Sequence, residues 1–172
     1  MLTLTINPKN KDKFQRLLEF LRQVLSVCDE LKIRPILDGS LAVLAYTQNP
    51  KLIVNNVNFS FPEKDYPKLS EALNKAGINA EIKEWHVLQA RKDDLKVEFS
   101  DINYWFSNLG IPIDSDILSL DDLKFRILKL DTLIAFYKGG IDDTKDDPKK
   151  VQKHKDMLEK YHLLLQVQRD QR

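Results

Sequence analysis

The clearest pattern along the chain is a helical repeat of apolar residues near its start. In residues 11–31 the apolar side chains recur at steps of three and four, and charged side chains occupy the opposite face. This spacing predicts an amphipathic helix that lies across a sheet. A shorter repeat predicts a second helix over residues 65–76, and Gly77 follows it where a glycine cap is expected.

Short apolar runs separated by turn residues predict the strands of that sheet. The first run ends in Asp38-Gly39-Ser40, and a helix of small apolar residues over 41–46 follows it. Pro62 ends the second run. The expected strands cover residues 36–37, 52–61, 78–85, 86–90, 95–99 and 117–120.

The last third of the chain predicts two helices. Residues 121–137 are apolar on nearly every side, which is typical of a buried helix. Ser119-x-x-Asp122 resembles a capping box at its start, and Gly139-Gly140 stands where it should end. After a charged loop, a last helix is expected to begin near residue 147. Its predicted buried stripe consists of Val151, His154, Leu158, Tyr161 and Leu165.

These elements predict an α/β (α+β) fold, in which a twisted mixed β-sheet is flanked by helices and completed by a C-terminal helical pair. A chain of 172 residues is long enough for one sizeable core. We therefore expect a single domain over residues 1–172. Its core would cover about 31–120, and the C-terminal helices about 121–165.

Composition narrows the class of protein without indicating a function. The formal net charge is +1, so no global field attracts nucleic acid or an anionic membrane. The single cysteine, Cys28, excludes a disulfide framework. The chain has neither an apolar run of membrane length nor a signal-peptide pattern at its N-terminus, so we expect a cytoplasmic protein with no membrane partner.

Candidate chemistry is concentrated between residues 36 and 61. A glycine at position 39 lets the backbone approach a ligand closely, and the helix behind it presents unpaired N–H groups to phosphate. Ser40 is also a plausible N-cap of that helix. On the next strand, Asn56 and Asn58 share one face because side chains alternate along a strand. Their alternative interpretation is a polar strand face turned to solvent.

This arrangement resembles the nucleotidyltransferase-fold superfamily, in particular its minimal and AbiEii-like members. In that family a strand, a Gly-Gly or Gly-Ser turn, a helix and a strand bearing Asp-x-Asp form the active site. The turn matches at Gly39-Ser40, but Asn56 and Asn58 stand where the family has aspartates. The resemblance places the third acidic position at Glu98, on a neighbouring strand.

The resemblance implies a nucleotide site. Gly39 and Ser40 would hold the triphosphate of ATP or another nucleoside triphosphate. Lys129 is one of several late cations that the family would bring to the nucleotide cleft.

The resemblance also implies a catalytic and metal site. Asn56, Asn58 and Glu98 would take the catalytic positions. Mg²⁺, required only if the protein is active, would bind Glu98. The family pattern does not include Asp38, but its place just before Gly39 makes it a candidate to join Glu98 around a single ion. The alternative role for Asp38 is to bond the backbone of the turn.

The two asparagines remove two of the three anions that would hold two metal ions. We therefore hypothesise a pseudo-transferase with a degenerate metal site, which binds a nucleotide or a protein partner and transfers nucleoside monophosphate weakly or not at all. The alternative is an active Mg²⁺-dependent nucleotidyltransferase acting on a small molecule such as an antibiotic, or on a protein in a toxin–antitoxin pair. A third hypothesis is a pure interaction domain.

Overall fold

The computed structural model describes residues 2–107 and 110–172, and it is built around one seven-stranded mixed sheet. The strand order is β3-β4-β5-β2-β1-β7-β6. Strand β1 is antiparallel to β2 and parallel to β7, and β2 is parallel to β5. The strands are β1 (Ile36–Asp38), β2 (Asn56–Phe61), β3 (Asn79–Lys83), β4 (Val87–Lys92), β5 (Leu95–Asp101), β6 (Ser115–Leu120) and β7 (Leu123–Leu128).

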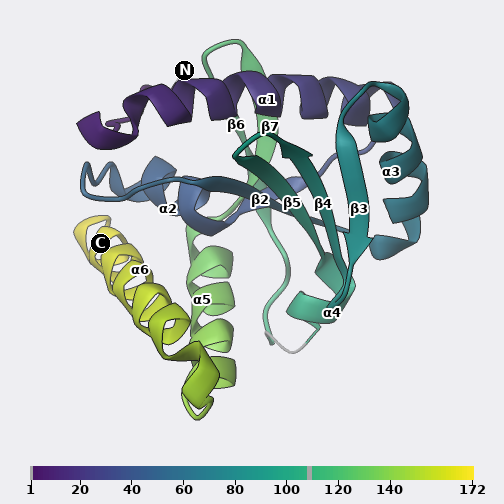
Figure 1. Cartoon of the computed structure of the whole chain (residues 1–172). Helices are drawn as coiled ribbons and strands as arrows, with labels where there is room; N and C mark the ends of the chain where they lie inside the picture. The colour runs from purple at the N-terminus through teal and green to yellow at the C-terminus, as the bar shows by residue number, and fades with distance from the viewer. Residues whose placement is uncertain (1, 108–109) are drawn as a thin grey trace.

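Helices lie on both sides of this sheet (Figure 1). The helices α1 and α3 cover one side, and α5 and α6 lie together on the other, beside α2. None of the helices in the described ranges is both long and apolar enough to cross a membrane. The helices are α1 (Lys11–Glu30), α2 (Gly39–Thr47), α3 (Tyr66–Lys75), α4 (Ile102–Phe106), α5 (Leu130–Thr144) and α6 (Val151–Asp170).

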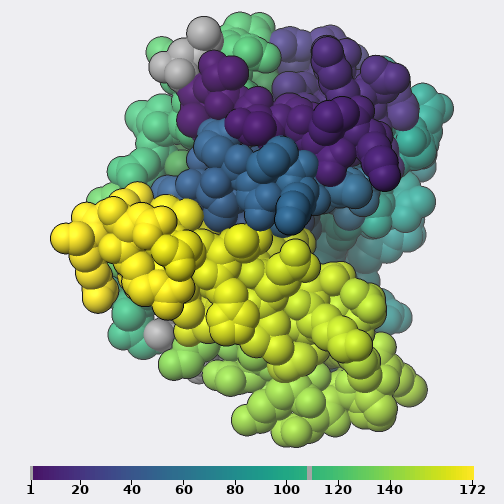
Figure 2. Space-filling model, turned by 90° about the vertical axis from the view of Figure 1, so that its left-hand side faces the viewer, coloured from purple at the N-terminus to yellow at the C-terminus, as the bar shows by residue number. Residues whose placement is uncertain are grey.

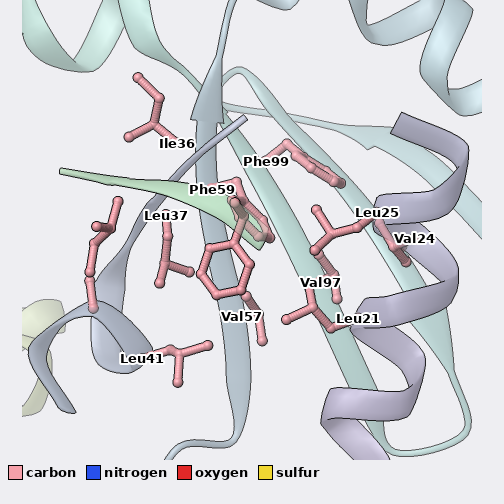
Figure 3. Close-up of a cluster of buried hydrophobic side chains, with 14 of the residues drawn as sticks. Leu21, Val24, Leu25, Ile36, Leu37, Leu41, Val57, Phe59, Val97 and Phe99 are labelled. Atoms are coloured by element: carbon pink, nitrogen blue, oxygen red, sulfur yellow. The ribbon is translucent and has the colours of Figure 1, made fainter. Parts of the chain in front are cut away.

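The main core forms between α1 and the central strands (Figure 3). Leu21 and Val24 point from α1 toward the sheet, where they meet Val57 of β2 and Val97 of β5. All four side chains are fully buried. The apolar repeat of residues 11–31 therefore does what its spacing predicts, and it fixes which face of β2 and β5 is apolar.

The fold class predicted from the sequence is confirmed, but the helix predicted over residues 121–137 is wrong in its first half. Residues Leu123–Leu128 form β7, which pairs with β1 in the middle of the sheet. The sequence Leu-Lys-Phe-Arg-Ile-Leu alternates, and burial alternates with it along the strand. The C-terminal helices consequently begin at Leu130, not near residue 121.

A tight hairpin replaces the predicted capping box. Leu120 pairs with Leu123, so Asp121 and Asp122 form the turn between β6 and β7. Asp121 has a φ of +52°, in the left-handed region, and no helix starts there.

Several element boundaries also differ from the predictions. β2 begins at Asn56, although the preceding Leu52 and Val54 are buried. The helix α5 continues through Gly139-Gly140 to Thr144, and in the last helix the fully buried side chain is Leu164, while Val151 is exposed. The connecting segment after β5 begins with α4, which was not predicted, and its residues 108–109 lie outside the described residues.

The hairpin assignment gives a direct test at Asp121. Asp121→Gly should keep the stability of the protein or raise its free energy of unfolding by up to about 1 kcal/mol, because glycine adopts a positive φ without steric cost. Lys124→Gly, at an exposed position inside β7, should instead lower it by about 0.5–1 kcal/mol. Urea denaturation measures both. If Asp121→Gly lowered the free energy of unfolding as much as Lys124→Gly, the assignment of Asp121 to a turn would be wrong.

Candidate functional site

The turn between β1 and α2 approaches β2 more closely than a side chain would allow. Gly39 has a φ of +69°, and a Cβ placed on it would lie 2.9 Å from the Cβ of Asn58. Asp38 and Asn58 are register partners on the adjacent strands. Glycine is therefore required here both for its backbone conformation and for space.

Asn56 and Asn58 share a face of the sheet, as predicted. Burial alternates along this part of β2: both asparagines are half-buried, and the intervening Val57 is fully buried toward α1. Because β2 and β5 are parallel and in register, Asn58 lies beside Glu98. The structure thus brings Gly39, both asparagines and Glu98 to one region of the sheet.

The carboxylate of Glu98 is paired with a lysine on its own strand. Lys96 Nζ lies 3.3 Å from Glu98 Oε1, and the two side chains are 31% and 20% exposed. Lys96 is the register partner of Asn56, so this ion pair runs alongside the two amides. A cation bound at Glu98 would compete with this ammonium.

Asp38 is buried and turned toward a different partner. Its Oδ2 accepts a hydrogen bond from Ser60 Oγ, and its side chain does not cap α2 or bond the turn backbone. Burial raises the pKa of Asp38 to about 6, against a smaller opposing effect of the Ser60 hydrogen bond. Its expected role as a metal ligand stays a prediction.

Ser40 lies inside the first turn of α2 and is not its N-cap; the cap position belongs to Asp38. The hydroxyl oxygen of Ser40 accepts a hydrogen bond of 2.8 Å from Lys160 Nζ. Lys160 comes from α6, which runs directly beneath α2 on the face shown in Figure 2. Burial lowers the pKa of Lys160, and the nearby Asp156 and Glu159 oppose this shift.

These elements line an open polar cleft of about 430 Å³ between α2, the segment before β2 and α6. Its polar lining residues are Ser40, Lys51, Asn55, Asn56, Asn58, Asp156, Glu159 and Lys160. Lys129 lies elsewhere, at the start of α5, where its ammonium pairs with Asp114 at 2.7 Å. Its predicted nucleotide-binding role gains no support from this position.

Lys160 is one of the cleft residues that the sequence analysis missed, and a signal for it was available. Lys160 is three residues from Met157 and four from Leu164, and both of these pack on the core. At helical spacing all three share one face of α6. A lysine on the apolar face of a helix indicates that its ammonium meets a polar partner.

A second group of potential metal ligands lies at the far end of β5. One ligand atom each from Glu63, His86 and Asp101 falls within 4.8 Å of the others. Glu63 Oε2 and His86 Nδ1 are 2.6 Å apart. The Asp101 carboxylate accepts hydrogen bonds from the backbone N–H groups of Glu63, Asn103 and Tyr104. The Asp101 carboxylate therefore caps α4 and binds the backbone of the segment that follows β2. These hydrogen bonds explain its position without a metal ion.

Comparison with known proteins identifies the fold. No family model matches the sequence, and no curated protein matches it. Among solved structures, ANT(2'')-Ia in solution superposes with a TM-score of 0.62 at 14% identity, over 87% of this chain and 83% of that one. A nucleotidyltransferase-like protein from Paracoccidioides brasiliensis gives 0.60 at 11% identity, over 88% and 77%. The lincosamide adenylyltransferase LnuA gives 0.55 at 13% identity, over 86% and 95%.

Similarity at such low identity shows the fold alone. The chain therefore has the nucleotidyltransferase fold, as its Gly-Ser turn and Asn-x-Asn strand suggested. Which residues act, and on what, has to be argued from the geometry of this chain.

The close approach at Gly39 should make this glycine harder to replace than Gly77. Gly77 has a φ of +80°, and a Cβ placed on it would meet nothing within 4 Å, so Gly77→Ala should cost only the conformational penalty, about 1–2 kcal/mol. Gly39→Ala adds the clash with Asn58 and should cost at least about 1 kcal/mol more. Urea denaturation compares the two variants. Equal losses would show that β1–α2 and β2 are not in close contact.

Because Asp38 is buried, we expect its ionisation to lower the stability of the protein as the pH rises. Its pKa is about 6 when folded, above its ordinary value of 3.8, so the folded protein holds this proton more tightly than the unfolded chain. The contribution of Asp38 to the free energy of unfolding is greatest below pH 4, where its carboxyl group is protonated. This contribution falls as the pH rises to about 6. Asp38→Asn should therefore gain about 2 kcal/mol relative to the natural chain between pH 4 and pH 7.

The measurement is urea denaturation at both pH values. Asp143→Asn, on the exposed surface of α5, serves as the control and should leave the pH profile unchanged. Parallel profiles for Asp38→Asn and the natural chain would show that Asp38 titrates normally.

Proposed function

We propose that the protein is a nucleotide-binding pseudo-transferase, in which transfer of nucleoside monophosphate is weak or absent. The observation that carries this proposal is the composition of the cleft. Asn56 and Asn58 line it together with Ser40 and Lys160, and the neighbouring carboxylate of Glu98 is paired with Lys96. The cleft keeps groups suited to phosphate, and the carboxylates on its lining, Asp156 and Glu159, come from α6 and not from the strand that carries the two amides.

The residues present do not fit a site for two divalent cations. Such a site uses carboxylates to clamp the ions that bind the attacking and leaving oxygens. Mg²⁺ prefers anionic oxygen ligands, and the two amides supply only neutral ones. Glu98 is engaged by Lys96, and Asp38 is buried against Ser60. We therefore derive no transfer step through a metal for this chain.

The second candidate is an active Mg²⁺-dependent transferase whose acceptor is a small molecule or a protein. Structures with the same fold favour it: one is ANT(2'')-Ia in complex with adenylyl-2''-tobramycin, and another is LnuA with lincomycin bound. In this case Glu98 and Asp38 would be the metal ligands. Binding of a protein partner in place of a nucleotide is a further form of the pseudo-transferase proposal.

Restoring the aspartates should restore metal affinity. We expect the double variant Asn56→Asp/Asn58→Asp to bind Mn²⁺ at least about tenfold more tightly than the natural chain, because it places two more carboxylates beside Glu98. Titration calorimetry or the EPR signal of Mn²⁺ measures this. Asn55→Asp is the matched control, since Asn55 lines the same cleft but precedes β2. It should change Mn²⁺ affinity little.

The natural chain should also fail as a transferase. Labelled ATP or GTP with Mg²⁺, and with tobramycin or lincomycin as acceptor, should release no pyrophosphate above the protein-free background. Release that depends on Mg²⁺ and is lost in Glu98→Gln would overturn the pseudo-transferase proposal and establish the active enzyme.

A further inference from the structure

We infer that the cleft binds the polyphosphate chain of a nucleoside triphosphate directly, without a divalent cation, and that the ammonium of Lys160 supplies the positive charge that a metal ion would otherwise provide. This inference rests on the proposed function, because it concerns the ligand of the same cleft. It goes further by naming the chemistry of recognition and its independence from metal.

The amides change the hydrogen-bonding character of the site. An ionised aspartate only accepts hydrogen bonds, as phosphate oxygens do, so aspartates and phosphates require a cation between them. Each asparagine carries two N–H donors. Asn56 and Asn58 are half-buried and line the cleft, so they offer donors to phosphate oxygens at positions where carboxylates would repel them.

Lys160 supplies the charge. Its ammonium carries three N–H donors, and one of them bonds the neutral hydroxyl of Ser40. The carboxylates of Asp156 and Glu159, which also line the cleft, belong to exposed residues of α6, where solvent and salt screen them. The half-buried ammonium of Lys160 bonds a neutral hydroxyl and forms an ion pair with neither of these carboxylates, so it can still pair with an anion that enters the cleft.

The start of α2 adds to this preference. Ser40 lies in its first turn, where backbone N–H groups lack partners within the helix and carry the positive end of its dipole. The bond between Lys160 and Ser40 therefore places a cation and a helix N-terminus at one point of the cleft. Lys51 is a further cation on the lining, but it is exposed and is screened as Asp156 and Glu159 are.

The position where a metal ion would bind already holds a cation. Lys96 Nζ neutralises Glu98 at 3.3 Å, so this carboxylate has little to gain from a divalent ion and does not confront an incoming phosphate with an unpaired charge. In this inference, the ammonium groups of Lys160 in the cleft and Lys96 on β5 thus supply the positive charge that metal ions would otherwise supply.

The test is calorimetric titration of the natural chain with ATP, GTP, inorganic triphosphate and adenosine, first in millimolar Mg²⁺ and then in EDTA. We expect ATP to bind in EDTA with an affinity equal to or higher than that in Mg²⁺, since the uncomplexed polyphosphate carries more charge. Lys160→Met keeps much of the apolar stem and should weaken ATP binding in EDTA at least tenfold. Lys153→Met, at an exposed position of the same helix, should leave it within twofold.

Each outcome separates the inference from the proposed function. Binding that requires Mg²⁺ would overturn the inference and leave nucleotide binding intact. Binding in EDTA that Lys160→Met does not weaken would overturn the role of Lys160. No binding under either condition would overturn both proposals. Triphosphate binding comparable to that of ATP supports recognition of the polyphosphate chain, whereas equal binding of adenosine would refute it. Thermal melting of each variant verifies that it is folded.

Discussion

The contact between the turn at Gly39 and the side chain of Asn58 sets the geometry of the whole cleft. Because Gly39 has no Cβ, the start of α2 can lie directly against β2, and Ser40 lines the cleft. The register of β2 with β5 then places Glu98 beside Asn58. One backbone position thus brings the helix N-terminus, the two amides and the carboxylate together, and the apolar packing of α1 on the opposite face keeps β2 and β5 in place.

Under the proposed function, charge distinguishes this cleft from a metal-dependent site on the same fold. Two carboxamides have nearly the shape of two carboxylates, so the fold tolerates the exchange without rebuilding the strand. The electrostatic result differs, because two negative charges are absent while lysines pair with Glu98 and Ser40. Similarity of fold to adenylyltransferases therefore says little about chemistry here, since chemistry depends on these few side chains.

The sequence predicted correctly those elements whose apolar residues follow one periodicity, either helical or alternating, from end to end. The repeat in α1, the glycine cap after α3 and the alternation at Asn56 and Asn58 were all correct. β7 was missed because its alternating residues run without a break into the apolar start of α5, so the combined stretch looked like one buried helix. Local pattern could not show that a strand from the last third of the chain inserts beside β1, since that pairing depends on the whole sheet. Lys160 was missed because the sequence analysis chose the wrong set of residues as the buried face of α6.

The glycine pair in α5 shows how the C-terminal helices reach the cleft. Gly139-Gly140 was expected to end a helix, but the helix continues, and the absence of a Cβ at Gly140 makes room for the end of the Met157 side chain of α6. Met157 lies one helical turn before Lys160, so the close packing of α5 and α6 determines where the ammonium lies. The hydrogen bond to Ser40 then joins residues 120 positions apart in the sequence. The cation of the cleft is therefore positioned by helix packing, which explains why no short motif in the sequence marks it.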